Sequence, residues 1–284
     1  MNRIPVLVPI VVSAVFHYLG PALAVLLFAH VPAPGVLWLR IASAALVFAV
    51  WRRAWVRSGA TVALGVVLAA MNTVFYLAIA RLPLSTVGAI EFLGVIALAA
   101  AGVRTRRNAA ALGLAAAGVA VLTEVRLAGQ PFGFVFAFAN CALFMGYIWL
   151  GHRIAGEGGG IDRLAGAMLV AAVVTAPFCA PAAAPAFAHP VWLAAGIGVG
   201  VCSSVVPYVA DQLVMARVSR STFALLLSAL PASATVIGLV VLGQLPTTRD
   251  LLGIGLVVAG LALHQERGTL RHRDDRLRAL RGQP

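Results

Sequence analysis

The sequence predicts an all-α membrane protein with ten transmembrane helices, arranged as two inverted repeats of five helices. Three observations lead to this prediction: the composition, a series of apolar runs, and a similarity between the two halves of the chain. Of the 284 residues, 62% are hydrophobic and 11% are charged, whereas soluble domains contain roughly 45–50% apolar and 25% charged residues. So few charges cannot cover a water-facing surface. We therefore exclude a soluble enzyme with a sizeable domain outside the membrane.

The first half of the chain contains five apolar runs, each close to the roughly 20 residues that a helix needs to cross the bilayer. They cover residues 6–29, 36–51, 60–80, 84–103 and 109–124. The first run follows Arg3 and contains Ala22-Leu23-Ala24, which resembles a signal-peptide cleavage site. The run is longer than the apolar region of a signal peptide, which has about 7–15 residues, so we expect it to remain as the first helix. The next four runs stop at charged residues, namely Arg52, Arg81, Arg104 and Glu124.

The second half contains five further apolar runs, which cover residues 131–151, 162–181, 190–214, 219–243 and 249–266. The sixth run ends before Arg153 and the eighth before Arg217. The seventh, ninth and tenth runs each have an arginine near their first residue, at Arg163, Arg220 and Arg249. Prolines within the runs are expected to kink their helices, and the carbonyls that a kink frees can line a cavity. These prolines are Pro21, Pro207 and Pro231.

The arginines predict that both termini lie in the cytoplasm. If the runs alternate in direction, 17 of the 21 arginines fall on the side of the termini and three on the other side, with Arg40 inside a run. Positive charge concentrates on the cytoplasmic side of membrane proteins, and the asymmetry favours an even number of crossings. The net charge of +12 comes in short bursts between apolar runs, so it fits membrane topology rather than a nucleic-acid-binding face.

The two halves of the chain are similar to each other. Residues 111–124 align with residues 253–266 with six identities, and two short blocks upstream match in the same order. Five helices per repeat is an odd number, so the second copy enters the membrane inverted. Inverted repeats are typical of secondary transporters, with the substrate site at the repeat interface. We expect a first repeat over 1–129, a second over 130–266, and a basic cytoplasmic tail over 267–284.

Polar residues inside the apolar runs are the candidate substrate site. An ionisable group at the bilayer centre costs about 2.5–3.5 kcal/mol on insertion scales, so each such group needs a partner or a function. Some of these residues are equally compatible with hydrogen bonds between helices, which holds for His17, Asn72 and Asn140. The candidates that we expect to line a central cavity are His17, Arg40, Asn72, Tyr76, Glu91 and Asn140.

Arg40 and Glu91 are the charged members of this set. A guanidinium matches a substrate carboxylate with two parallel hydrogen bonds; the alternatives for Arg40 are a pair with Glu91 or extension to the outer headgroups. Glu91 is the candidate proton-coupling residue, because burial favours its neutral form while a nearby arginine favours its charged form. The alternative for Glu91 is a structural carboxyl that holds helices together.

Asp211 and Arg217, near the cytoplasmic end of the eighth run, are the candidate cytoplasmic gate. The alternative for Asp211 is a salt bridge to Arg217 or Arg220. The aromatic residues nearest the ends of the runs are interpreted as interfacial anchors; they are Trp38, Trp51, Tyr147 and Tyr208. The three cysteines lie in apolar runs without metal-ligand spacing, so we expect neither a metal site nor another cofactor.

Short motifs along nearly the whole chain resemble a known family. They are Ala33-Pro34-Gly35-Val36 with Leu39-Arg40, Met71-Asn72 with Phe75-Tyr76-Leu77, Glu91-Phe92, Pro207-Tyr208 before Asp211, Ser221-Thr222-Phe223 and Leu242-Gly243. Together they resemble the EamA family of the drug/metabolite transporter superfamily, and within it the bacterial inner-membrane threonine/homoserine exporters. Two carboxyls that such proteins often carry are absent, because Leu230 precedes Pro231 and Gln244 follows Gly243.

The resemblance implies a secondary active exporter of small metabolites such as threonine and homoserine. Glu91 favours proton antiport as its mechanism, and the alternatives are uniport and channel-like leakage. The resemblance also implies a monomer or homodimer in the inner membrane, with amino acids, protons and the lipid bilayer as partners and no nucleic acid. Relatives of the same shape carry other metabolites or drugs, which is the alternative. A membrane-embedded enzyme is disfavoured because no HExxH motif occurs, and an ATPase because no P-loop motif occurs. A purely structural membrane protein is disfavoured by Arg40 and Glu91.

Overall fold

The structure is a computed structural model that describes residues 7–52, 58–101, 105–123, 130–156, 159–218, 223, 227 and 230–263. Throughout these residues the regular structure is helical, and they contain no strand. Five helical segments are long and apolar enough to cross a membrane: Ala33–Arg52, Gly59–Ile79, Pro131–Gly156, Gly160–Cys179 and the continuous segment Pro190–Met215. The prediction of an all-α protein with membrane-spanning helices is therefore confirmed at this level.

The helices of the first half coincide closely with the predicted apolar runs. They are α1 (Leu7–Leu27), α2 (Ala33–Arg52), α3 (Gly59–Ile79), α4 (Leu84–Ala101) and α5 (Arg106–Thr123). Helix α3 has a conventional start, because the Ser58 hydroxyl accepts a hydrogen bond from the Thr61 backbone N–H and so satisfies one of the free donors of the first turn. Helix α1 continues through Pro21.

The helices of the second half include two short ones that the sequence did not predict. The long segments are α6 (Pro131–Gly156), α7 (Gly160–Cys179), α9 (Pro190–Gly200), the π-helix η2 (Val201–Val205), α10 (Val206–Met215), α12 (Leu230–Leu242) and α13 (Thr248–Leu263). Between α7 and α9 the chain forms a 3-10 turn, η1 (Pro181–Ala183), and the single-turn helix α8 (Ala184–Phe187). Segments α9, η2 and α10 run on without a break and are called the α9–α10 segment below.

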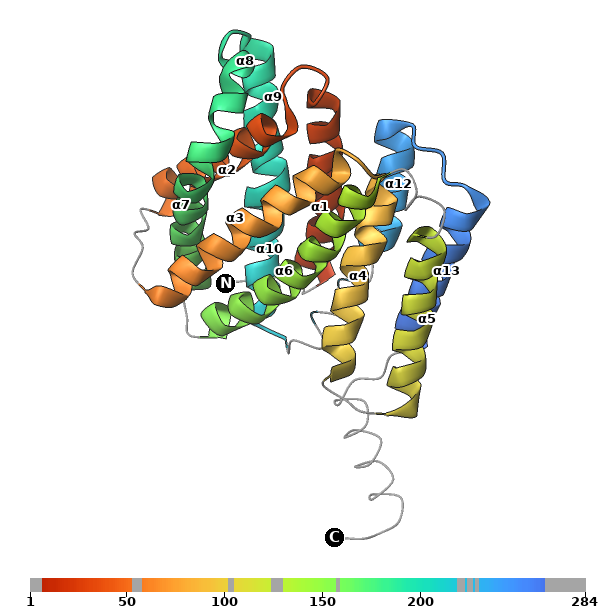
Figure 1. Cartoon of the computed structure of the whole chain (residues 1–284). Helices are drawn as coiled ribbons and strands as arrows, with labels where there is room; N and C mark the ends of the chain where they lie inside the picture. The colour runs from red at the N-terminus through yellow and green to blue at the C-terminus, as the bar shows by residue number, and fades with distance from the viewer. Residues whose placement is uncertain are drawn as a thin grey trace, which may run out of the picture.

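The helices pack in a bundle in which the two halves of the chain interleave (Figure 1). Helices α5 and α13 lie side by side at one edge, whereas α2 and α7 pack together towards the opposite edge. Between these edges, α3 packs against α6 and α7, and α1 packs against the α9–α10 segment and α12. Residues from both halves therefore face the middle of the bundle, where the polar side chains of the apolar runs meet.

Two glycines let the α9–α10 segment approach its neighbours closely near η2. A Cβ added at Gly20 of α1 would lie 2.0 Å from the Ser203 Oγ, and one added at Gly200 would lie 1.9 Å from the Ser43 Oγ of α2. A side chain at either position would force the helices apart. The π-helix, an element often found at functional sites, is thus held between α1 and α2.

Candidate functional site

A small cavity in the middle of the bundle collects most of the predicted polar residues. The volume open to the centre of a water molecule is about 20 Å³, which is enough for one or two water molecules. Its walls come from α1, α2, α3, α4, α6 and α10. The residues that line it are His17, Pro21, Arg40, Met71, Asn72, Phe75, Glu91, Asn140 and Tyr208.

Arg40 is buried inside the bundle and its side chain is held by the α9–α10 segment. It is 4% exposed, so it does not extend to the headgroups. Its Nε donates to the Ser204 Oγ at 2.8 Å, and its Nη2 donates to the Ser203 carbonyl oxygen at 2.9 Å and to the Tyr208 hydroxyl at 3.4 Å. Its third nitrogen, Nη1, is buried without a hydrogen-bond partner. The guanidinium is thus fixed through two of its nitrogens, and the third keeps its donors available.

Tyr76 lies beside the Arg40 guanidinium rather than on the wall of the cavity. The guanidinium carbon is 5.3 Å from the centre of the Tyr76 ring, a distance at which the ring stabilises the cation. Tyr76 is therefore placed to support Arg40 and is one step removed from the cavity itself.

Glu91, on α4, is the carboxylate of the cavity. It is 3% exposed, and its Oε2 accepts a hydrogen bond from the Tyr18 hydroxyl at 3.2 Å. Among the described residues the ion pair within 4.0 Å is between Arg52 and Asp162, at 2.7 Å. Arg40 and Glu91 therefore line the same cavity without a direct salt bridge between them.

Asn72 and Tyr208 connect the walls formed by α3 and α10. The Asn72 Nδ2 donates to the Leu68 carbonyl oxygen at 2.7 Å, and its Oδ1 accepts from the Tyr208 hydroxyl at 3.2 Å. The interpretation of Tyr208 as an interfacial anchor is wrong, because this residue is 1% exposed and bonded inside the bundle. The sequence did carry a signal for its position, since Tyr208 lies three residues before Asp211 and so on the same helix face.

Asp211 is a second buried carboxylate, in a separate cluster. It is fully buried, and it accepts hydrogen bonds from the Ser13 hydroxyl and, at 2.9 Å, from the Tyr147 hydroxyl. These bonds join α10 to α1 and α6. Tyr147 is also fully buried, so its interpretation as an interfacial anchor is wrong too. Tyr147 contacts Tyr208 with ring centres 5.4 Å apart, which places the cluster next to the cavity.

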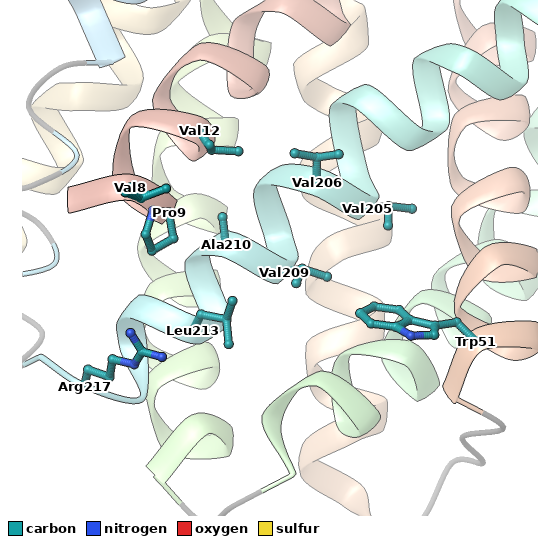
Figure 2. A pocket seen from close by; sticks show the side chains of 10 residues that line it. All are labelled: Val8, Pro9, Val12, Trp51, Val205, Val206, Val209, Ala210, Leu213 and Arg217. Carbon is teal, nitrogen blue, oxygen red and sulfur yellow. The ribbon is translucent and has the colours of Figure 1, made fainter. Parts of the chain in front are cut away.

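Arg217, the other residue of the predicted gate, lines an apolar groove of about 340 Å³ between α1, the end of α2 and α10. Figure 2 shows this groove, whose walls are valine, proline, alanine and leucine side chains with Trp51 at one side and Arg217 at one end. A second apolar groove, of about 480 Å³, lies between the C-terminal end of α1 and helix α9. Both grooves are larger than the central cavity but lack its paired polar groups. The central cavity is therefore the candidate site for a charged small molecule.

Leu230 and Gln244, which stand where the resembling proteins often carry carboxyls, both have contacts that the structure describes. Leu230 is 1% exposed and belongs to the core. The Gln244 Oε1 accepts a hydrogen bond from the Leu84 backbone N–H at 3.2 Å, so it satisfies a free donor at the start of α4. The described residues contain no group of three or more His, Cys, Asp or Glu side chains that could hold a metal ion.

Comparison with known proteins gives consistent matches along the chain. Residues 131–264 match the model of the EamA-like transporter family. The threonine/homoserine exporter RhtA of Escherichia coli (strain K12) is 33% identical over 275 residues, which is 91% of this chain and 92% of that protein. The exporter of the same name from Salmonella typhimurium (strain LT2) is 31% identical over 272 residues, 91% of each chain. A protein of known crystal structure has a TM-score of 0.63 and 17% identity, over 91% of this chain and 97% of that one, and so shares the fold.

Proposed function

The chain belongs to the EamA-like transporter family, and from that premise we propose that it exports small amino acids of the threonine and homoserine type in exchange for protons. The relatives described above are exporters, and the chain is accordingly a multi-pass inner-membrane transporter rather than an enzyme. The observation that carries the substrate class is the presence of a buried arginine and a buried glutamate on one cavity, each without a direct ion pair to the other.

An amino acid carries the two charges that this cavity complements. The unpartnered Nη1 of Arg40 is a donor for the substrate carboxylate, and hydrogen bonds between charged groups contribute more than neutral ones. Glu91 accepts from Tyr18 through one oxygen and keeps capacity for a substrate ammonium group. Asn72 and Tyr208 hold the wall beside Arg40, and His17 and Asn140 complete the polar lining.

The cavity must widen before it takes a substrate. About 20 Å³ open to water centres is far below the roughly 300–1,000 Å³ of ordinary ligand pockets. We propose that the cytoplasmic side opens when the bonds from Ser13 and Tyr147 to Asp211 break, because these bonds tie α1 and α6 to α10. Arg217, two residues beyond the end of α10, belongs to the same cytoplasmic gate.

Glu91 is the proposed coupling residue. A buried carboxyl changes protonation readily when the cavity opens to water on either side, because burial and nearby positive charge act on it in opposite directions. A substrate ammonium and a proton would compete for the same carboxylate, so export of one is coupled to entry of the other. Asp211 accepts hydrogen bonds from two hydroxyl donors while the cavity is closed, and we assign it to the gate rather than to coupling.

Two sets of contacts support two inverted repeats, over 1–129 and 130–266, with both termini in the cytoplasm. If α1 to α5 correspond to α6, α7, the α9–α10 segment, α12 and α13, the contacts map onto one another. Thus α3 packs on α6 and α7, as the α9–α10 segment packs on α1 and α2, and α4 packs on α6, as α12 packs on α1.

Contacts at the helix ends join segments that this topology places on the same side. Arg52 pairs with Asp162, and the Arg107 Nε donates to the Leu263 carbonyl oxygen at 2.7 Å; all four residues fall on the cytoplasmic side. The bond between Gln244 and Leu84 joins two segments on the outer side.

The test is the flux of a panel of labelled amino acids in proteoliposomes that contain the purified protein, with and without an imposed pH gradient. We expect threonine and homoserine to be moved and a pH gradient to accelerate their movement against a concentration gradient. No flux of any amino acid in the panel would contradict the substrate class. Threonine flux that is indifferent to the pH gradient would contradict proton exchange alone.

A further inference from the structure

We propose that His17 and Asn140 form a subsite for a hydroxyl group on the substrate side chain, so that the carrier selects hydroxylated amino acids over apolar ones of the same shape. The inference rests on the proposed amino-acid export and adds a basis for selection among amino acids. It starts from two atoms of the central cavity that the binding of the amino acid's charged groups does not use.

The two atoms are the His17 Nδ1 and the Asn140 Nδ2. Both residues line the cavity, and both nitrogens are buried without a hydrogen-bond partner. Buried polar atoms in proteins nearly always have a partner, and leaving one unsatisfied costs about 1–3 kcal/mol. Two such atoms on one small cavity indicate a ligand group, or a water molecule in its place, that bonds to both.

His17 on α1 and Asn140 on α6 line the same small cavity. The His17 ring lies edge-on to the Phe144 ring with centres 5.7 Å apart, and Phe144 follows Asn140 by one helical turn on the same face of α6. Asn140 and Glu91 line the same cavity. A substrate whose ammonium group meets Glu91 therefore presents its side chain near this pair.

A hydroxyl group matches both nitrogens, whereas a methyl group matches neither. The Asn140 amide nitrogen can only donate, and the Nδ1 of a neutral His17 accepts when the ring proton is on Nε2. A hydroxyl accepts from the first and donates to the second. A methyl group in the same place would displace water and leave both atoms unsatisfied, and sites built to bond a hydroxyl reject the analogue without it strongly.

Threonine and valine test this directly, because they differ by a hydroxyl in place of a methyl group. The measurement is counterflow of labelled threonine and labelled valine in proteoliposomes, expressed as the ratio of kcat/KM for the two. We expect the unmodified protein to favour threonine by about tenfold or more. In Asn140→Leu the ratio should fall towards one, mainly through loss of threonine transport, while valine transport is kept or increased.

Asn72→Leu is the matched control. Asn72 lines the same cavity, but Leu68 and Tyr208 already satisfy its amide. The same substitution there should lower the flux of both amino acids and leave their ratio unchanged. His17→Phe is the second test variant, because it keeps the ring against Phe144 and removes the acceptor nitrogen; its ratio should also fall.

The outcomes separate this inference from the proposed function. If the unmodified protein moves threonine and valine equally well, amino-acid export stands and the hydroxyl subsite is wrong. The subsite is also wrong if folded His17→Phe and Asn140→Leu both keep the original ratio. If the unmodified protein neither moves nor binds either amino acid, the proposed function fails and the subsite fails with it. If the Asn140→Leu protein does not insert into the membrane, the threonine-to-valine ratio of His17→Phe decides whether the subsite is correct.

Discussion

Arg40 is a charged side chain that is buried in an apolar bundle and held there by hydrogen bonds. Three hydrogen bonds from Nε and Nη2 to Ser203, Ser204 and Tyr208 fix the guanidinium, and the Tyr76 ring lies beside it. These contacts use two of the three guanidinium nitrogens and leave Nη1 without a hydrogen-bond partner, in a residue that lines the cavity. The charge is therefore stabilised without being neutralised by a carboxylate.

Arg40→Lys is expected to abolish most threonine transport although the charge is kept. A lysine ammonium carries all of its N–H donors on one nitrogen. It therefore cannot bond to the α9–α10 segment and to a substrate carboxylate at the same time. Loss of one charged hydrogen bond costs about 1.5–3 kcal/mol, so KM should rise roughly tenfold or more. Arg81→Lys, at an exposed arginine, is the control and should transport normally. Wild-type flux in Arg40→Lys would remove Arg40 from the site.

Glu91→Gln is expected to fold and to lose the effect of a pH gradient on transport. Glutamine keeps the shape of the side chain and an oxygen that can accept from the Tyr18 hydroxyl, but it cannot take up and release a proton. The measurement is threonine flux at several imposed pH gradients. Asp162→Asn, which changes an exposed surface ion pair with Arg52, should keep the pH response. Unaltered flux and pH dependence in Glu91→Gln would assign Glu91 to helix packing.

Among the elements, the α9–α10 segment connects the site to the bundle. Its π-helix carries Ser203 and Ser204, the partners of Arg40, and Gly200 lies just before it against α2. A Cβ at Gly200 would lie 1.9 Å from the Ser43 Oγ and 2.6 Å from the Arg40 carbonyl oxygen. Any side chain there must move α2, and with it Arg40.

Gly200→Ala should therefore reduce both stability and transport. Forcing extra volume into a packed contact costs about 1–3 kcal/mol, and displacement of α2 should weaken threonine binding. The measurements are thermal unfolding of the detergent-purified protein and threonine flux. Gly255→Ala, where an added Cβ meets nothing within 4 Å, should be neutral or slightly stabilising, since alanine is the better helix former. Equal behaviour of the two variants would mean that this contact does not hold Arg40 in place.

The sequence predicted the positions of the helices better than the contacts between them. Most helices begin and end within a few residues of the apolar runs. This is because the thickness of the bilayer sets both the length of an apolar run and the distance between the arginines that flank it. The short helices after α7 were missed, since Pro181–Phe187 is apolar and proline-rich and gives no periodic signal. The bonds from Tyr18 to Glu91 and from Ser13 to Asp211 could not be predicted, because they join residues far apart in the chain whose proximity depends on how the helices pack.

At the scale of the whole molecule, the way in which the two halves interleave bears on how the chain crosses the membrane. Helices of one half pack on helices of the other in pairs that map onto each other when the halves are exchanged. With the five crossings per half that we propose, the two halves would insert with opposite orientation. The 17 arginines on one predicted side are the basis for our proposal that this side is cytoplasmic.

Single-cysteine labelling tests that topology. In a background where the three native cysteines are replaced, a membrane-impermeant maleimide added to intact spheroplasts should label Gln130→Cys and should not label Gly282→Cys. Permeabilised cells should show labelling of both, which controls for accessibility. Labelling of Gly282→Cys from outside would contradict the even number of crossings or the orientation.

Arg40 and Glu91 are proposed to hold the two charges of one amino acid together. The most direct measurement is inhibition of labelled-threonine counterflow by analogues that each lack one charge, namely threonine methyl ester without the carboxylate and N-acetylthreonine without the ammonium group. Unlabelled threonine should compete fully, whereas each analogue should compete at least about tenfold less well, as expected for loss of one charged contact. Competition by either analogue as strong as that by threonine would contradict the binding of both charges by Arg40 and Glu91.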